Sequence, residues 1–352
     1  MNERYARQIS LAEIGEKGQQ KLLSSQVAIV GCGGLGAIAA TYIAGAGVGR
    51  MILVDGDVPS LSNVHRQVLY TGRETESKAA SLKKRLNALN PEVGIKISPA
   101  YLTKDNINEL LTGVDLILEC TDDIMCKYLV NDFAALDQIP LVYGAIYKYE
   151  GYVSTFLNTS DEDIHLRDIF PEPDDTLPTC AEVGVLNTIA GLIGLLQANE
   201  ALKVMLGIGE VLSNQLLTYD CLSNRQMTLK LKKNWDKDLE EHYEKTSYTS
   251  LDCSFVSEIE IDELLKNRAD YKLVSVMTAA EHQAIDNETL HNISLTADFS
   301  ALANSEKPIV LYCKYGRTSK QTAAKLLDAY PNKNILSLKN GYQAYQKFKA
   351  SH

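Results

Sequence analysis

Residues 26–36 read QVAIVGCGGLG, a short run of β-forming apolar residues that leads directly into a cluster of glycines. Small residues follow to about Ala46, and a second apolar run, RMILVD, covers residues 50–55. A glycine turn between a strand and a helix lets a phosphate approach the backbone, and the helix N-terminus offers it unpaired N–H groups. Asp55 follows about 20 residues later, where a carboxylate can bind ribose hydroxyls. This stretch therefore predicts a nucleotide-binding strand–helix–strand unit.

Apolar runs continue to alternate with helical patterns after this unit. We expect strands at residues 114–120 and 140–145, and helices at 35–46, 77–89 and 125–137. This alternation predicts a Rossmann-like α/β domain with a doubly wound, mainly parallel sheet. The expected elements that complete it are strands at 151–157, 215–220 and 227–231 and a long apolar helix at 183–205. The acidic segment 158–179 is expected to be a structureless functional loop.

The length of 352 residues predicts two or three domains. The charged run KKNWDKDLEEHYEK at 232–245 fits a linker and a solvated helix equally well. We expect a first domain over 1–235, a linker over 236–256 and a smaller α/β domain over 257–352. The elements expected in the smaller domain are helices at 258–267, 319–329 and 342–349 and strands at 272–276, 308–312 and 334–338.

The composition excludes several classes of protein. A net charge of −10 argues against a general nucleic-acid binder, which needs a basic face. The N-terminal stretch MNERYARQIS lacks the apolar core of a secretion signal, and no run reads as a good membrane span. We therefore expect a cytoplasmic protein with no membrane partner. Its seven cysteines include no CxxC pair, so neither a disulfide framework nor a tetrathiolate zinc site is indicated.

Polar and charged residues near the glycine turn change the expectation from dinucleotide binding to triphosphate chemistry. A domain that transfers hydride binds a diphosphate without cleaving it, whereas attack at the α-phosphate of ATP builds negative charge that Arg, Lys and Mg²⁺ neutralise. Asp122 follows a strand, the place of a metal ligand at the crevice of an open sheet. On the glycines alone, an NAD or FAD domain is an even alternative. The residues of the set are Arg4, Arg7, Asp55, Asp57, Asn63, Arg66, Gln67, Lys78 and Asp122.

Together these motifs resemble the MoeB/ThiF/HesA family, relatives of ubiquitin-activating enzymes, over about residues 1–232. The matching motifs are RYxRQ, GxGGLG, DxD, LSNxxRQ, an isolated lysine, CTDD and the stretch TCAEVG at 179–184. The resemblance implies an enzyme that uses ATP and Mg²⁺ to adenylate the C-terminal glycine of a ubiquitin-like sulfur carrier protein. It also implies a homodimer. The Gly-Gly tail of the carrier is expected to thread under the 158–179 loop.

The resemblance also assigns roles to individual residues. Asp55 is implied to bind ribose, and Asp122 to coordinate Mg²⁺ and to be essential for adenylation. Arg7 is implied to reach across the dimer interface into the partner's site. The residues implied to line the nucleotide or contact its phosphates are Gly31, Gly33, Gly34, Gly36, Asp57, Asn63, Arg66, Gln67 and Lys78.

Two departures from the family pattern concern cysteine. Where many relatives bind a structural zinc with two CxxC pairs, this chain has His165 and Asp168 for the first pair and Lys237 and Glu240 near the second. Because lysine is no zinc ligand, we expect no zinc and a domain end held by packing alone. Cys180 lies where ubiquitin-activating relatives place a nucleophile. A covalent role, helped by Arg167 and the start of the following helix, and a plain loop position are even alternatives. The cysteines expected to be packing residues are Cys32, Cys120, Cys126 and Cys221.

The C-terminal part contains a second candidate thiol. The apolar run IVLY at 309–312 leads into CKYGRTS at 313–319, a loop whose N–H groups, Lys314 and Arg317 stabilise a thiolate at Cys313. Residues 257–352 resemble a rhodanese domain, which carries sulfur as a persulfide on the cysteine matching Cys313. The usual Asp-Val-Arg is replaced by the residues at 275–277, and the usual GHIPGA stretch is reduced at 289–293.

The combined prediction is an adenylyltransferase that also transfers sulfur, from a cysteine desulfurase or thiosulfate, to form a thiocarboxylate on the carrier. Three alternatives stay open: adenylation of a peptide or another carboxylate, an NAD-dependent oxidoreductase, and a non-catalytic scaffold. The sequence does not distinguish molybdopterin, thiazole and tRNA-thiolation carriers.

Overall fold

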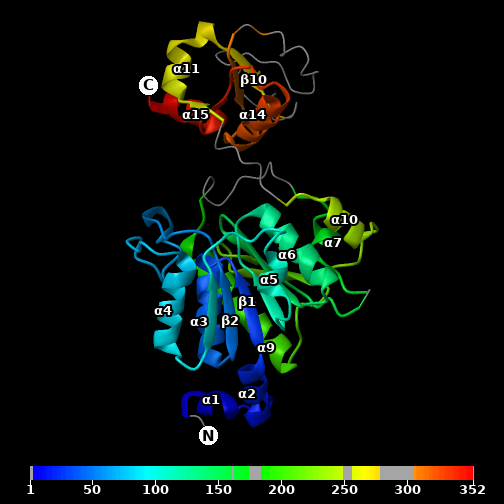
Figure 1. Ribbon diagram of the computed structural model, residues 1–352. Coiled ribbons are helices and arrows are strands. Elements are labelled where there is room, and N and C mark those ends of the chain that lie inside the picture. Colours follow the sequence, from blue (N-terminus) through cyan, green and yellow to red (C-terminus); the bar gives the residue numbers. More distant parts are fainter. Residues whose placement is uncertain are drawn as a thin grey trace. The chain divides into compact units, whose positions relative to one another are not determined.

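The computed structural model describes residues 3–160, 162–173, 184–248, 256–277, 305 and 307–351. The described residues up to Tyr248 form one compact unit, and those from Val256 onward form a second (Figure 1). Residues 236–248, expected to belong to a linker, thus pack on the first unit, because the aromatic side chains of Trp235, Tyr243 and Tyr248 are buried there.

Eight strands form the sheet in the described part of the first unit, in the order β3-β2-β1-β4-β5-β6-β7-β8. The first five strands of that order pair in parallel and the last three antiparallel, which confirms the predicted doubly wound, mainly parallel α/β fold. The edge strand β3 was not predicted, because only one of its residues is buried. The strands are β1 Gln26–Val30, β2 Arg50–Val54, β3 Gly94–Ser98, β4 Leu116–Glu119, β5 Leu141–Tyr147, β6 Glu150–Phe156, β7 Gln215–Asp220 and β8 Arg225–Lys230.

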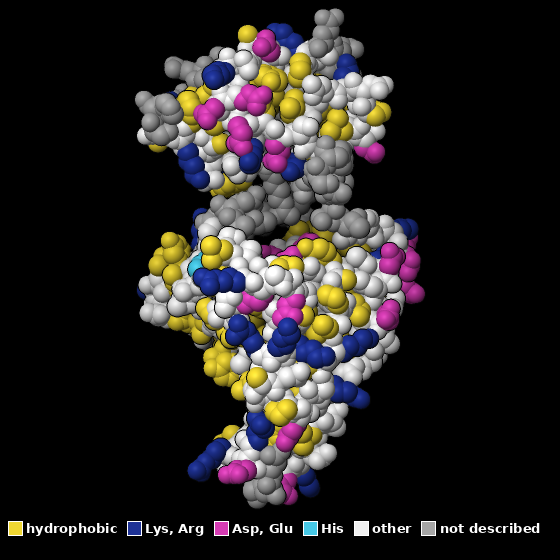
Figure 2. Space-filling model, turned by 60° about the vertical axis from the view of Figure 1, so that its left-hand side comes forward, with side chains coloured by type: hydrophobic (Ala, Val, Ile, Leu, Met, Phe, Trp, Pro, Cys, Tyr) yellow, Lys and Arg dark blue, Asp and Glu magenta, His cyan; other side chains and the backbone are white. Residues whose placement is uncertain are grey.

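Helices cover both faces of this sheet, so alternate residues of β1 enter two different cores. Val27 and Ile29 pack in a core with α2, α3, α4 and α9, whereas Ala28 and Val30 pack in a core with α5, α6 and α10. The helices are α1 Ala6–Ile9, α2 Gly15–Ser24, α3 Gly34–Ala46, α4 Lys78–Leu89, α5 Ile107–Leu111, α6 Ile124–Leu136, α7 Leu166–Ile169, α9 Asn187–Leu206 and α10 Leu239–Lys245. Figure 2 shows a row of Lys and Arg side chains across the first unit, so the net negative charge is unevenly distributed.

Helix α9 is long and apolar enough to span a membrane by length and composition. Half of its apolar stretch is buried inside the protein, where the helix packs against α3 and the strands β5 and β6. A Cβ atom at Gly194 would lie 2.4 Å from the Leu35 carbonyl oxygen, so α9 and α3 need glycine for their close approach. The helix therefore contributes to the core of the first unit.

The second unit contains a parallel sheet, which in its described residues has the order β10-β11-β12-β9. The helix expected over 258–267 was wrong at its start. Residues 258 and 259 pair with β12 as a two-residue strand, too short to leave a hydrophobic pattern. The elements are β9 Glu258–Ile259, α11 Ile261–Lys266, β10 Lys272–Ser275, β11 Ile309–Tyr312, α14 Arg317–Ala329, β12 Ile335–Leu338 and α15 Gly341–Ser351.

Candidate active site

The glycine turn follows β1 and accepts no larger residue at two positions. Gly31 has a φ of +90°, and a Cβ atom there would lie 2.8 Å from the carbonyl of Cys120. A Cβ atom at Gly36 would lie 1.8 Å from the Gly31 carbonyl oxygen. The turn thus brings the N-terminus of α3 against the carboxyl ends of β1 and β4. Its open backbone and the helix N–H groups fit the phosphates of a nucleotide.

Asp55 ties the end of β2 to this turn. Its Oδ2 accepts a hydrogen bond from the Cys32 N–H at 2.7 Å, and its Oδ1 accepts one from the Asp57 N–H at 2.8 Å. Burial raises the pKa of Asp55, and Lys78 and the two N–H groups oppose that shift. Because each carboxylate oxygen has two acceptor positions, Asp55 can still accept hydrogen bonds from ribose hydroxyls.

Asp57 holds the buried lysine of the site. The Lys78 Nζ atom lies 2.7 Å from Asp57 Oδ2, and the Tyr101 hydroxyl donates to Asp57 Oδ1 at 2.5 Å. Burial alone would raise the pKa of Asp57, but the hydrogen bonds from Lys78 and Tyr101 lower it. The hydrogen bond to Asp57 in turn raises the pKa of Tyr101 to about 12. Sequence reasoning missed Tyr101, because it follows the unpredicted strand β3 and belongs to no motif.

The LSNxxRQ motif forms a wall beside the glycines. The Arg66 guanidinium donates to Asn63 Oδ1 at 3.0 Å, and a Cβ atom at Gly34 would lie 3.2 Å from the Arg66 carbonyl oxygen. Gln67 is buried against Gly33, and among the described residues its Oε1 accepts no hydrogen bond. The predicted phosphate contacts Asn63, Arg66 and Gln67 are thus brought to the turn.

Asp122 is exposed in the connection between β4 and α6. Its neighbour Asp123 caps α6, accepting hydrogen bonds from the N–H groups of Met125 and Cys126 at 2.8 and 3.3 Å. The charges of Asp57, Asp55 and Asp122 all contribute to the raised pKa of Tyr101. The described residues include no cluster of three or more candidate metal ligands. Mg²⁺, however, commonly uses one or two carboxylates together with substrate phosphates, and Asp122 fits that use.

Arg7 is not brought to this site within one chain. Its neighbour Gln8 donates to the Ala46 carbonyl at 3.0 Å, at the C-terminal end of α3. The glycine turn lies at the opposite end of that helix, about 18 Å away for 13 residues. Figure 1 shows α1 and α2 at one end of the unit.

His165 and Asp168, which stand where the family pattern has its first CxxC pair, form a capping box at the start of α7. The His165 ring caps α7, and the His165 N–H donates to Asp168 Oδ2 at 2.9 Å. Asp168 Oδ1 accepts the N–H groups of Asn234 and Trp235 at 2.6 and 2.7 Å, which ties the end of the sheet domain to α7. The expectation of packing alone was therefore wrong. The described first part of the 158–179 segment is also folded, because the buried Leu166 and its helix anchor it.

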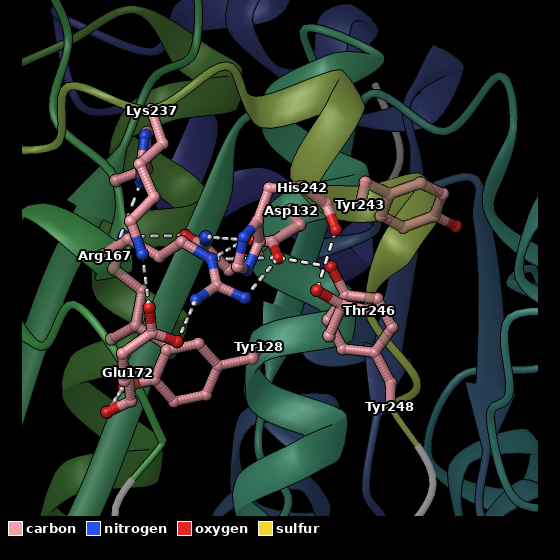
Figure 3. Close-up of polar contacts among 12 residues, drawn as sticks. Tyr128, Asp132, Arg167, Glu172, Lys237, His242, Tyr243, Thr246 and Tyr248 are labelled. Atoms are coloured by element: carbon pink, nitrogen blue, oxygen red, sulfur yellow. Dashed lines mark hydrogen bonds and ion pairs between the residues drawn. The ribbon is translucent and has the colours of Figure 1, made fainter.

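Arg167 occupies the centre of a buried cluster next to this box (Figure 3). Its Nε donates to both Asp132 oxygens at 2.9 and 3.0 Å, and its second terminal nitrogen lies 2.7 Å from Oδ2. The guanidinium also lies over the rings of Tyr128 and Trp235. Its charge is thus paired with Asp132 and, at 3.7 Å from Nη1, with Glu172. Cys180 itself lies outside the described residues.

Cys313 directly follows β11 in the second unit and is buried. The Gly316 N–H donates to its Sγ atom at 3.0 Å, and Gly316 has a φ of +95° that turns the chain into α14. The Ser319 hydroxyl lies 3.6 Å from the same sulfur. Burial raises the pKa of three other thiols, those of Cys32, Cys120 and Cys126. Those three thiols are thus poor nucleophiles, in line with a packing role.

Known protein families match both units of this protein. The model of the ThiF family matches residues 5–239, and that of the rhodanese-like domain matches residues 259–348. The chain belongs to the ThiF family, and a rhodanese-like domain follows.

Two relatives illustrate the match. The sulfur carrier protein adenylyltransferase of Thermus thermophilus is 43% identical over 239 residues, covering 65% of this chain and 87% of its own. A Mycobacterium tuberculosis protein named "Probable adenylyltransferase/sulfurtransferase MoeZ" is 33% identical over 348 residues, covering 93% and 88%. The crystal structure of PaaA has a TM-score of 0.56 at 23% identity over 66% of this chain and 74% of its own. That likeness shows the fold of the first unit.

Proposed function

We propose that this protein activates the C-terminal carboxylate of a ubiquitin-like sulfur carrier with ATP and then converts it to a thiocarboxylate. Three contacts support the proposal: Asp55 accepts the Cys32 N–H of the glycine turn, Lys78 pairs with Asp57, and Gly31 packs on the segment that leads to Asp122. The two relatives described above carry adenylyltransferase activity in their names, and one also carries sulfurtransferase. A carboxylate is a poor electrophile, and adenylation gives it a good leaving group.

The first unit has residues for each part of the adenylation. Asp55 orients the ribose, and the glycine turn with Asn63 and Arg66 receives the phosphates. When the carrier carboxylate attacks the α-phosphate, pyrophosphate leaves, and Lys78 exchanges Asp57 for the growing negative charge. Mg²⁺, bound by Asp122, would neutralise further charge on the phosphates. The glycine turn of the same chain lies a helix length away from Arg7. Arg7 therefore completes the site of the partner subunit in a cytoplasmic homodimer.

The second unit supplies the sulfur. Thiosulfate or a persulfidated cysteine desulfurase transfers one sulfur atom to Cys313, releasing sulfite or the free thiol of the donor. The terminal persulfide sulfur attacks the acyl carbon, AMP leaves, and an acyl disulfide joins Cys313 to the carrier. A second thiol, with Cys180 as the candidate, then attacks the Cys313 sulfur and releases the thiocarboxylate. The resulting disulfide is reduced by an external thiol.

Isotope exchange and intact mass test this proposal. Wild-type protein should show carrier-dependent ATP–pyrophosphate exchange that Asp122→Ala abolishes, and exchange that survives this substitution contradicts the adenylation role. Incubation with ATP and a panel of Gly-Gly carriers and short peptides, followed by intact mass, identifies the acceptor. Modification of a peptide and of no carrier would favour the peptide-adenylating alternative.

A further inference from the structure

A buried carboxylate accepts hydrogen bonds from the connection that carries Asp122. Glu119, the last residue of β4, is fully buried. Its Oε1 atom accepts the Thr121 N–H at 2.8 Å and the Thr121 hydroxyl at 2.5 Å. The hydroxyl also lies 3.3 Å from the Asp123 carbonyl, but its single proton favours the shorter, charged acceptor. One carboxylate oxygen therefore closes the turn that immediately precedes Asp122.

The second oxygen of Glu119 is neutralised by Lys127. This lysine extends from α6, is 7% exposed and pairs with Glu119 Oε2. Its Nζ also donates to the Gly144 carbonyl of β5 at 3.0 Å. Burial raises the pKa of Glu119 and by itself would lower that of Lys127, and the contact between the two groups opposes both of these effects. The pair therefore adds no net charge beside Asp122, and its influence on that residue is geometric.

Both ends of the connection are also fixed to neighbouring elements. Downstream, the Asp123 side chain caps α6. Upstream, a Cβ atom at Gly31 would lie 2.8 Å from the Cys120 carbonyl and 2.9 Å from the Thr121 nitrogen, so the glycine turn rests directly on this segment. The backbone conformation at Thr121 consequently sets the distance between Asp122 and any phosphate bound at the turn.

We propose that Thr121 is a positioning residue, whose hydroxyl, held by Glu119, directs the Asp122 carboxylate toward a metal-bound nucleotide on the glycine turn. Within this connection only Asp122 touches the ligand, and Lys127 compensates the buried charge of Glu119. The inference rests on the proposed adenylation and adds a residue to its machinery.

The first test compares three threonine variants. Thr121→Val keeps the shape and the backbone N–H but removes the hydroxyl, and Thr121→Ser restores a hydroxyl. Thr155→Val is the matched control, because the Thr155 hydroxyl on β6 also donates to a buried carboxylate, Glu200 Oε2, at 2.8 Å. The readout is Mg²⁺-dependent binding of a non-hydrolysable ATP analogue by isothermal titration calorimetry.

We expect Thr121→Val to weaken Mg²⁺-dependent binding about tenfold, or about 1.4 kcal/mol, as for one hydrogen bond to a charged group. The Thr121→Ser and Thr155→Val proteins should bind like wild type, and binding in EDTA should be equal in all four proteins, because the glycine turn is intact. Equal binding by Thr121→Val and Thr155→Val overturns the positioning role. A wild type that binds no analogue and exchanges no pyrophosphate instead refutes the proposed function.

A second pair of variants keeps the test decisive if Thr121→Val does not fold. Glu119→Gln with Lys127→Met removes both buried charges but keeps an oxygen acceptor for Thr121. Glu119→Leu with Lys127→Met removes the acceptor as well. We expect the first double variant to bind the analogue within about threefold of wild type and the second about tenfold more weakly. Equal affinities of the two double variants contradict the proposal.

Discussion

Replacing Asp132 by asparagine should leave the buried Arg167 guanidinium with only the exposed Glu172 carboxylate, 3.7 Å from Nη1, as counter-charge. Arg167 is 1% exposed, and Asp132 accepts its hydrogen bonds at 2.7 to 3.0 Å as well as one from the Tyr248 hydroxyl at 2.5 Å. Removing one partner of a buried ion pair costs about 3–5 kcal/mol. At about 2–4 °C per kcal/mol for a unit of this size, we expect the Tm of the first unit to fall by roughly 6–20 °C.

Differential scanning calorimetry of the full chain measures this shift, with two controls. The exposed ion pair between Lys245 and Glu241 lies on α10 of the same unit, and Glu241→Gln should change stability by less than about 1 kcal/mol. Asp132→Leu with Arg167→Met removes both charges and should recover most of the lost stability. A strong chelator should leave the wild-type Tm unchanged, because hydrogen bonds to Asp168 and the Arg167–Asp132 ion pair, rather than a metal, hold this end of the first unit together.

Two results would refute this reasoning. An Asp132→Asn protein that melts within about 2 °C of wild type would mean that the buried guanidinium does not depend on its partner. A chelator that lowers the wild-type Tm would mean that a metal contributes to the closure. Elemental analysis of the purified protein for zinc separates that second result from a non-specific effect of the chelator.

Three further predictions concern other parts of the molecule. Gly36→Ala should abolish ATP binding measured by calorimetry, because its methyl group would lie 1.8 Å from the Gly31 oxygen, whereas Gly45→Ala in the same helix has no atom within 4 Å and should bind normally. Burial lowers the pKa of His165 and His242, so the unfolded chain binds more protons below about pH 6.5 and the free energy of unfolding should fall as the pH drops through that value. In urea titrations, His165→Asn should flatten that slope, and an unchanged slope would contradict the assignment. Thiosulfate should add one sulfur atom to wild type and to Cys126→Ala but none to Cys313→Ala, as read by intact mass.

Short sequence patterns were sufficient to predict those candidate site residues that directly follow a strand. The glycine turn, the Asp55 carboxylate and the Cys313 loop each follow a short strand, and the structure places them as the sequence indicated. Strand β3, strand β9 and Tyr101 were missed, because a half-exposed edge strand and a two-residue strand leave no hydrophobic period, and a single tyrosine in a loop leaves no motif.

The alternation of apolar runs and helical patterns determined the two-part α/β fold from sequence alone. The sequence also determined the glycine turn, because only glycine fits where backbones approach as closely as at Gly31 and Gly36. Only the tertiary structure decided how side chains distant in the chain pair with one another. It joined Arg167 to Asp132 across 35 residues, and it separated Arg7 from the turn by the length of α3. A buried charge must be compensated by whatever opposite charge the fold brings near it, and sequence spacing does not encode that distance.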